Sequence, residues 1–160
     1  MKRVLIIGCP GSGKSIFARA LHAATDLPLT YLDMLYWNAD RTTVSSEVFL
    51  SRLQDVLQQE KWIIDGNYAS SLPLRLDACD TVFFLDYPVE LCLDGIRNRM
   101  GTARPDIPWI EMEEDPEFVE FVRSFSETTR PTILHLLQER NLNIHVFHSR
   151  EEAERFLQSL

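Results

Sequence analysis

A glycine-bounded segment near the start of the chain constrains the fold more than any other feature. Residues 8–15 read Gly-Cys-Pro-Gly-Ser-Gly-Lys-Ser and match the pattern G-x-x-x-x-G-K-[ST]. Four apolar residues before them are typical of a buried strand, and a helical pattern follows to about residue 24. A strand, a glycine-rich turn and a helix in this order predict a Walker A phosphate-binding loop. The glycines let backbone amides point inward at phosphate oxygens, and the helix adds its positive end.

The expected ligand of this loop is the polyphosphate of ATP, bound together with Mg²⁺. Lys14 is expected to reach the β- and γ-phosphates, and the Ser15 hydroxyl to bind the Mg²⁺ ion. The other predicted phosphate contacts come from Gly8, Pro10, Gly11, Ser12 and Gly13. The alternative is a glycine-rich turn that binds nothing. The strand before the loop and the helix after it favour nucleotide binding.

Short apolar runs alternate with helical patterns along the rest of the chain. This order predicts βαβ units and a parallel sheet. The predicted strands are residues 4–7, 29–32, 62–64, 81–85 and 144–147. Pro88, the pair Asp115-Pro116 and the S-x-x-E box at Ser149 each mark a helix start. We therefore expect a three-layer α/β/α sandwich with a five-stranded parallel sheet, the P-loop NTPase architecture.

One segment, from about residue 101 to 115, is polar, contains proline and has no periodicity. An irregular segment of this length in a compact domain is usually functional or mobile. Together with the start of the next helix it predicts a mobile lid at about residues 100–128, within a single domain over residues 1–160. The acidic run inside it is expected to be a solvated face of the lid rather than a metal site.

The overall charge and the cysteine count indicate the compartment and the partners. The formal net charge of −8 disfavours direct nucleic-acid binding, which depends on Lys and Arg neutralising phosphates. The three cysteines are widely spaced and form no C-x-x-C pair, as expected for reduced thiols in a cytoplasmic protein. No stretch is long enough to span a bilayer, so no membrane partner is expected.

Three carboxylates follow predicted strands at the same edge as the phosphate loop, where open α/β sheets bind ligands. Asp65 closes the third strand and is the candidate Mg²⁺ ligand, acting directly or through water. Asp33 follows the second strand and could accept a proton from an acceptor hydroxyl. Asp86 closes the fourth strand, where a helix cap is the favoured interpretation. Caps or turn aspartates remain the alternative for all three.

Phosphoryl transfer also needs positive charge around the moving group, and arginine suits phosphate oxygens. The candidates lie in or beside the predicted lid: Arg97, Arg99, Arg104, Arg123 and Arg130. Residues two apart on a helix point in roughly opposite directions, about 200° at 3.6 residues per turn. Arg97 and Arg99 therefore cannot both face the site unless the helix has ended. The alternative for each arginine is a surface ion pair.

These residues resemble the adenylate-kinase-like family of small P-loop kinases over nearly the whole chain. The segments DMLYW (33–37), WIIDGNY (62–68) and RPD (104–106) are similar to those of the bacterial DNA topology modulation protein-like subgroup. The resemblance implies a lid that closes over ATP, and a monomer. It also implies lid arginines that bind phosphate: Arg99 aligns with one, and Gly95 stands where another would be, so that Arg97 is its candidate substitute.

The chain departs from this family at the expected acceptor site. Adenylate kinases follow the Asp-Gly pair with Phe-Pro-Arg, whose arginine holds the acceptor's phosphate, whereas Asn67-Tyr68 stand here. Tyr36 and Trp37 could stack on an acceptor ring or only cover the core. The leading hypothesis is a kinase that transfers the γ-phosphoryl group of ATP to a small acceptor. A nucleotide-dependent switch or ATPase and a regulator of DNA topology or transcription are the alternatives.

Overall fold

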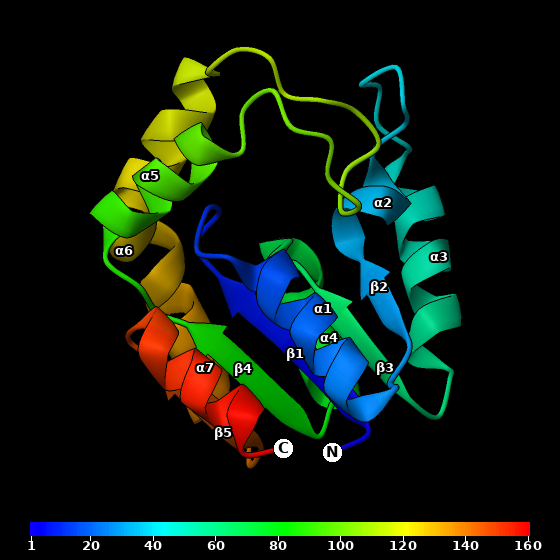
Figure 1. Ribbon diagram of the computed structural model, residues 1–160. Coiled ribbons are helices and arrows are strands. Elements are labelled where there is room, and N and C mark those ends of the chain that lie inside the picture. The colour runs from blue at the N-terminus through cyan, green and yellow to red at the C-terminus, as the bar shows by residue number, and fades with distance from the viewer.

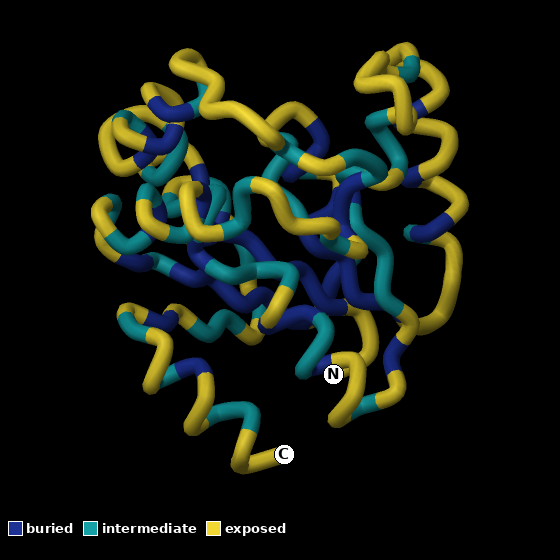
Figure 2. The backbone as a smooth tube through the Cα atoms, turned by 45° about the horizontal axis from the view of Figure 1, so that its top comes forward, coloured by how far each residue is buried: buried dark blue, intermediate teal, exposed yellow.

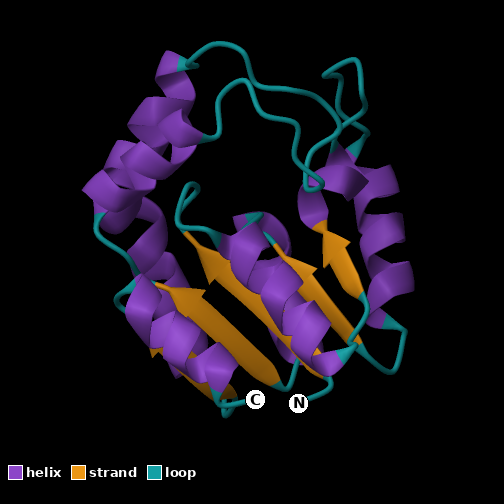
Figure 3. Ribbon diagram, in the orientation of Figure 1, coloured by secondary structure: helices purple, strands orange, loops and turns teal.

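Five parallel strands form one sheet in the order β2-β3-β1-β4-β5. Their bounds are Arg3–Gly8 (β1), Leu29–Tyr31 (β2), Trp62–Asp65 (β3), Thr81–Leu85 (β4) and Asn143–Phe147 (β5). The computed structural model describes all residues, 1–160. The three central strands β1, β3 and β4 are buried almost throughout, because helices cover both faces of the sheet (Figures 1 and 3). The predicted P-loop NTPase α/β fold is confirmed.

The helices form the two outer layers and the walls above the sheet. Helices α1 (Lys14–Thr25) and α7 (Arg150–Gln158) lie on one face, and α4 (Leu72–Ala78) lies on the other (Figure 1). Helices α5 (Val89–Asn98) and α6 (Pro116–Gln138) rise on one side, and α2 (Leu32–Tyr36) and α3 (Ser46–Leu57) on the other (Figure 1). None of the helices combines the length and apolarity needed to cross a membrane.

Two of the three predicted helix starts carry side-chain caps, and the third, α5, begins at Val89 with Pro88 as its N-cap residue. The Asp115 side chain accepts a hydrogen bond from the amide of Glu117, and Pro116 is the first residue of α6. The Ser149 side chain accepts from the amide of Glu152 and opens α7. Each cap accepts from a first-turn amide that has no partner within the helix. Because the capping residue and this amide are close in the chain, the cap can be recognised from the local sequence.

Three short helical elements were not predicted: α2, the 3-10 turn η1 (Ala69–Ser71) and α4. Strand β2 ends at Tyr31, one residue earlier than predicted, and α2 starts directly after it. Asp33 therefore lies in the first turn of a helix rather than in a loop. Helices of five and seven residues carry too few apolar repeats for a periodicity to appear.

One buried cluster of 33 residues fills the space between the layers, and the buried trace follows the central strands (Figure 2). All three cysteines are buried and unpaired, in agreement with the prediction of free thiols. Above the carboxyl ends of the strands, the segment 99–115 crosses from α5 to the neighbourhood of α2 (Figure 3). We call residues 99–115 the lid segment.

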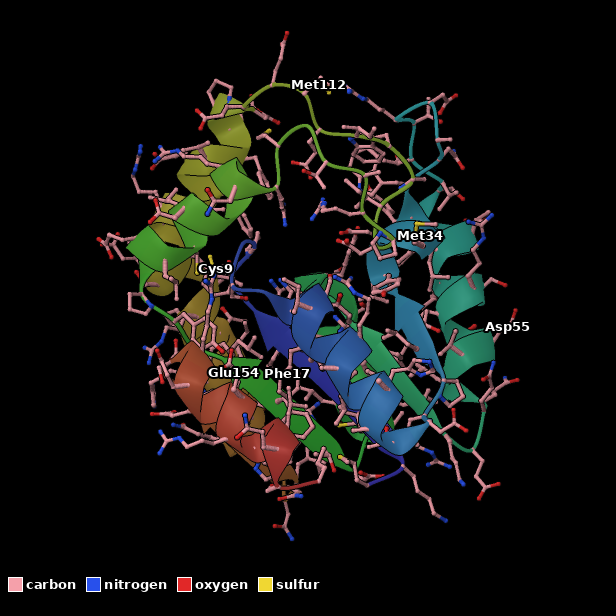
Figure 4. All side chains as sticks on the ribbon, in the orientation of Figure 1. Cys9, Phe17, Met34, Asp55, Met112 and Glu154 are labelled. Atoms are coloured by element: carbon pink, nitrogen blue, oxygen red, sulfur yellow. The ribbon has the colours of Figure 1, made fainter.

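The lid segment rests on the far wall through aromatic and backbone contacts. The Trp37 and Trp109 rings meet edge-on with centroids 4.8 Å apart. The Arg41 guanidinium donates a hydrogen bond to the Ile110 carbonyl oxygen at 3.3 Å. Met112 lies on the outer run of the segment, exposed to solvent (Figure 4). The lid segment thus roofs the space above the sheet.

Candidate active site

A cleft of about 970 Å³ opens at the carboxyl edge of the sheet. Its walls come from the phosphate loop, α1, α2, the turn after β3, the end of α5, the lid segment and α7. Of the predicted site residues, the cleft is lined by Pro10, Gly11, Ser12, Gly13, Lys14, Ser15, Asp33, Asp65, Arg99 and Arg104. The fold therefore brings together residues from distant parts of the chain in one place.

The phosphate loop curls through left-handed backbone conformations that only glycine adopts without strain. Gly11 has φ +85° and Gly13 has φ +96°. Gly13 is also the N-cap of α1, and no side chain caps this helix. The first amides of α1 therefore remain open toward the cleft, as an anion-binding helix end requires. The Lys14 amine lies over the same loop, 3.4 Å from the Cys9 carbonyl oxygen.

The phosphate loop packs directly against α5 through two glycines. A Cβ atom on Gly95 would lie 2.0 Å from the Gly11 carbonyl oxygen, and one on Gly11 would lie 2.0 Å from the Cys92 carbonyl oxygen. Cys9 lies in the same region, with its Sγ atom 3.9 Å from the Val122 carbonyl oxygen on α6 (Figure 4). Gly95 stands where the family resemblance implied an arginine. Because Gly95 has no side chain, α5 can pack against the phosphate loop.

Replacing Gly95 with alanine is expected to destabilise the protein by about 1–3 kcal/mol, because the new methyl group overlaps backbone. In an unconstrained helix the same change would be stabilising by roughly 1 kcal/mol. The sign of the change in unfolding free energy, measured by urea denaturation, therefore tests the close approach. Asp94→Ala, on the exposed part of α5, is the matched control and should stay within about 0.5 kcal/mol of wild type. A Gly95→Ala protein as stable as wild type would contradict this packing.

Ser15 and Asp65 meet at the floor of the cleft. The Ser15 hydroxyl donates a hydrogen bond to Asp65 Oδ2 at 2.6 Å. Asp65 is only 5% exposed, and its Oδ1 atom has no hydrogen-bond partner. Burial raises the pKa of Asp65 to about 6, although the Lys14 charge and the Ser15 hydrogen bond act in the opposite direction.

The polar atoms around this floor fit a magnesium-bound triphosphate. Four cleft side chains carry a buried atom without a partner: Ser12 Oγ, Arg19 Nη1, Asp65 Oδ1 and Arg99 Nε. Each is a donor or an acceptor that a phosphate oxygen or a hydrated cation would satisfy. No group of three or more His, Cys, Asp or Glu side chains is placed to hold a metal ion. A Mg²⁺ site does not require such a group, since Mg²⁺ is usually held by one or two protein oxygens together with phosphates and water.

A hydrogen-bonded turn after β3 connects the phosphate loop with Asp33. The Asn67 side chain brackets Gly8, accepting from its amide at 3.0 Å and donating to its carbonyl oxygen at 2.6 Å. The next side chain, Tyr68, donates its hydroxyl to Asp33 Oδ1 at 2.5 Å. Burial raises the pKa of Asp33, and the Tyr68 hydrogen bond and the Lys14 charge oppose this.

Arg75, on α4, holds that turn in place. It is fully buried and donates hydrogen bonds to the Ser71 hydroxyl and to three successive carbonyl oxygens, those of Gly66, Asn67 and Tyr68. Sequence reasoning missed both Arg75 and the roles of Asn67 and Tyr68. The available signal was an arginine enclosed by leucines in the run Leu72-Pro-Leu-Arg-Leu.

The five candidate arginines separate into two groups. Arg99 and Arg104 line the cleft. Helix α5 ends at Asn98, and Arg99 is its C-cap residue with helical backbone angles, so the two side chains point in different directions as their spacing predicts. Arg97 instead pairs with Glu114 at 3.0 Å on the exposed surface.

The other two arginines, both on α6, are also placed away from the cleft. Arg123 is more than half exposed and pairs with Glu120. Arg130 makes two hydrogen bonds of 2.8 Å to the Asp86 carboxylate, beside a second cavity of about 400 Å³. The favoured interpretation of Asp86 as a helix cap is corrected, because Pro88 is the N-cap of α5 and Asp86 binds Arg130.

The acidic run of the lid segment is only partly a solvated face. Glu113, Glu114 and Asp115 are exposed, as predicted. Glu111 is not: its Oε1 atom lies 2.5 Å from Arg104 Nη2 and 3.6 Å from Arg99 Nη2. Glu111 therefore pairs with both arginines that line the cleft.

Two solved structures that share this fold are shikimate kinases. The shikimate kinase from Bacteroides thetaiotaomicron has a TM-score of 0.64 and 18% identity, covering 99% of this chain and 95% of that one. The shikimate kinase from Acinetobacter baumannii, solved in complex with shikimate, has a TM-score of 0.64 and 16% identity, covering 99% and 92%. At this identity the likeness establishes the P-loop NTPase α/β fold and no more. No protein-family model and no curated protein sequence matches the chain, and the DNA topology modulation subgroup stays a prediction.

Proposed function

We propose that this chain is a Mg-ATP-dependent kinase that transfers the γ-phosphoryl group of ATP to the hydroxyl group of a small acceptor. The observation that carries the proposal is the contact between Ser15 and the buried carboxylate of Asp65. It lies beside an uncapped helix end and at the floor of a large cleft. A polyphosphate and a divalent cation would satisfy these groups together.

Each residue of the phosphate end has a defined role in this proposal. The loop amides and Lys14 bind the β- and γ-phosphates, and Ser15 and Asp65 hold Mg²⁺ directly or through water. When bound, Mg-ATP supplies an electrophilic γ-phosphorus and a leaving group of reduced charge. Arg99 contributes positive charge from the roof, where Arg104 is held by ion pairs with Asp106 and Glu111. Arg97, Arg123 and Arg130 are left out, because each is placed outside the cleft walls.

Asp33 is the proposed general base. Tyr68 fixes its carboxylate by donating to Oδ1, which leaves Oδ2 for the hydroxyl group of an acceptor. In the transfer the acceptor oxygen bonds to the γ-phosphorus while the bond to the bridging oxygen breaks. The bridging oxygen keeps the electron pair, and the hydroxyl proton goes to Asp33. Because burial raises the pKa of Asp33, it is a better proton acceptor than a solvated aspartate.

The lid segment serves this reaction by keeping water out. Its contacts with the far wall, Trp109 against Trp37 and the Ile110 carbonyl with Arg41, close the cleft on the side away from α5. Excluding water strengthens electrostatic interactions in the site and prevents hydrolysis of ATP without an acceptor.

A screen of ADP release against nucleosides, nucleotides, sugars and hydroxy acids tests the proposal. We expect at least one acceptor to accelerate ADP release, and Lys14→Ala to lower kcat/KM by about 100-fold or more, as loss of a charge-stabilising donor does. Lys61→Ala removes an exposed lysine and should leave turnover unchanged. A Lys14→Ala protein that binds Mg-ATP as tightly as wild type would overturn the phosphate-binding role of the loop.

A further inference from the structure

The end of the cleft beyond the phosphate loop is where an acceptor would bind. It is formed by α2, the turn after β3 and the tip of the lid segment (Figure 1). The side chains that line it include Asp33, Tyr36, Trp37, Tyr68 and Asp106. Asp33 marks the position of the acceptor hydroxyl, so the body of the acceptor must lie among these residues.

Arg104, which lines the cleft from the lid segment, already has two carboxylate partners. Arg104 Nη2 lies 2.5 Å from Glu111 Oε1, and Arg104 Nη1 lies 3.3 Å from Asp106 Oδ2. The three side chains are only 14%, 17% and 8% exposed, respectively. The guanidinium is therefore neutralised and shielded from water. It offers little attraction to a further anion.

The other cations of the cleft are committed or distant. Arg99 shares Glu111 with Arg104, and Lys14 lies over the phosphate loop. Arg19 and Arg150 line the cleft from α1 and α7, two helices that lie on one face of the sheet, below the lid segment in Figure 1. The guanidinium groups of Arg99 and Arg104 are thus accompanied by three carboxylates: Asp33 and Asp106, which line the cleft, and Glu111, which pairs with both arginines. Even with Asp33 protonated, the positive charges do not exceed the negative ones.

We infer that the acceptor is a hydroxyl compound that carries no phosphate or carboxylate group. This inference rests on the proposed function and narrows its substrate class. An anionic group entering this end would lose water and meet carboxylates without a free cation to replace it. An uncharged body fits better, because the half-buried rings of Tyr36 and Trp37 offer apolar surface to a sugar or nucleoside ring.

Matched pairs of acceptors that differ in one anionic group test this inference in the wild-type protein. Suitable pairs are adenosine with AMP, uridine with UMP, sorbitol with gluconate, and methyl shikimate with shikimate. In every pair that yields ADP, we expect the neutral member to have a kcat/KM at least about ten-fold higher. If an anionic member is preferred, the inference fails and the proposed kinase function stands. If no member of any pair is phosphorylated, both fail.

The variant Asp106→Asn tests the cause. It removes one carboxylate from Arg104, so we expect the preference within a pair to shift about ten-fold toward the anionic member. Glu113→Gln removes the same charge from an exposed position of the lid segment and should leave the preference unchanged. Glu111→Gln removes the other carboxylate that pairs with Arg104. This second variant serves as the test if Asp106→Asn does not fold. An unchanged preference in both cleft variants would overturn the inference.

Discussion

Replacing Arg75 with methionine is expected to lower the free energy of unfolding by about 3 kcal/mol or more. Arg75 is fully buried, and it contacts no carboxylate; its partners are the Ser71 hydroxyl and three backbone carbonyl oxygens. Burial lowers its pKa to about 9, which still leaves the guanidinium charged at neutral pH. Methionine has similar length but no donor, so three buried carbonyl oxygens would lose their partner, at about 1–3 kcal/mol each before relaxation.

The same substitution is expected to impair the active site, because Arg75 fixes the turn that carries Asn67 and Tyr68. Asn67 brackets Gly8 of the phosphate loop, and Tyr68 orients Asp33. We therefore expect weaker ATP binding and a lower kcat in any Arg75→Met protein that remains folded.

Urea denaturation and an ATP titration measure the two effects of this substitution. Arg52→Met is the matched control, since Arg52 is exposed and donates to a single carbonyl oxygen, that of Leu35. If the Arg75→Met protein lost no more stability than the control, the turn after β3 would not depend on Arg75 for its stability.

The parts of this fold that could be predicted from the sequence are those set by local chemistry. The phosphate loop, the five strands and the caps at Asp115 and Ser149 each depend on a few neighbouring residues. Arg75 was missed for the opposite reason. Its partners belong to the turn after β3, whose carbonyl oxygens converge only when α4 packs beneath the sheet.

The candidate arginines show the same limit. The sequence spacing predicted that the side chains of Arg97 and Arg99 point in different directions on a helix. It could not predict which of the two faces the cleft. The structure shows that α5 ends at Asn98, that Arg99 lines the cleft and that Arg97 pairs with Glu114 outside it. Arg130 could not be distinguished from Arg99 by composition, and only tertiary structure reveals that Asp86 binds it.

Gly95 is a further case in which the fold explains a residue that the sequence could only mark as unusual. A glycine inside a helix costs up to about 1 kcal/mol relative to alanine. Only glycine fits at position 95, because any side chain there would overlap the Gly11 carbonyl oxygen. The constraint is a contact between residues far apart in the chain, so no local pattern contains it.

Replacing Asp65 with asparagine is expected to stabilise the protein in the absence of ligand, and to abolish its response to Mg-ATP. Asp65 is almost completely buried, and its pKa is raised from 3.8 to about 6. Below about pH 4 the group is protonated in both the folded and the unfolded chain, so it has no effect on stability. Between these two pKa values the folded state keeps a proton that the unfolded state has released. Stability therefore falls as pH rises through this window.

Above about pH 6 the full cost of the buried charge is present, roughly 3 kcal/mol for a shift of about two pH units. Asparagine does not ionise, and its oxygen can still accept the Ser15 hydrogen bond. Its amide group would lack an acceptor, which offsets about 1 kcal/mol of the gain. We expect Asp65→Asn to be more stable than wild type by about 2 kcal/mol at pH 7.5. Near pH 4 only the unpaired amide remains, so the variant should be less stable than wild type by about 1 kcal/mol.

Thermal melting at several pH values, with and without millimolar Mg-ATP, measures both parts of this prediction. Asp55→Asn on the exposed face of α3 (Figure 4) is the control and should show neither effect. Bound Mg-ATP stabilises only the state that binds it, so wild type should gain about 2.7 kcal/mol at a ligand concentration of 100 Kd while Asp65→Asn gains nothing. The order of the two melting temperatures should then reverse when Mg-ATP is added. A reversal would mean that the chain keeps a buried charge at the expense of its own stability because that charge holds the metal; a ligand-free Asp65→Asn protein less stable than wild type at pH 7.5 would contradict this account.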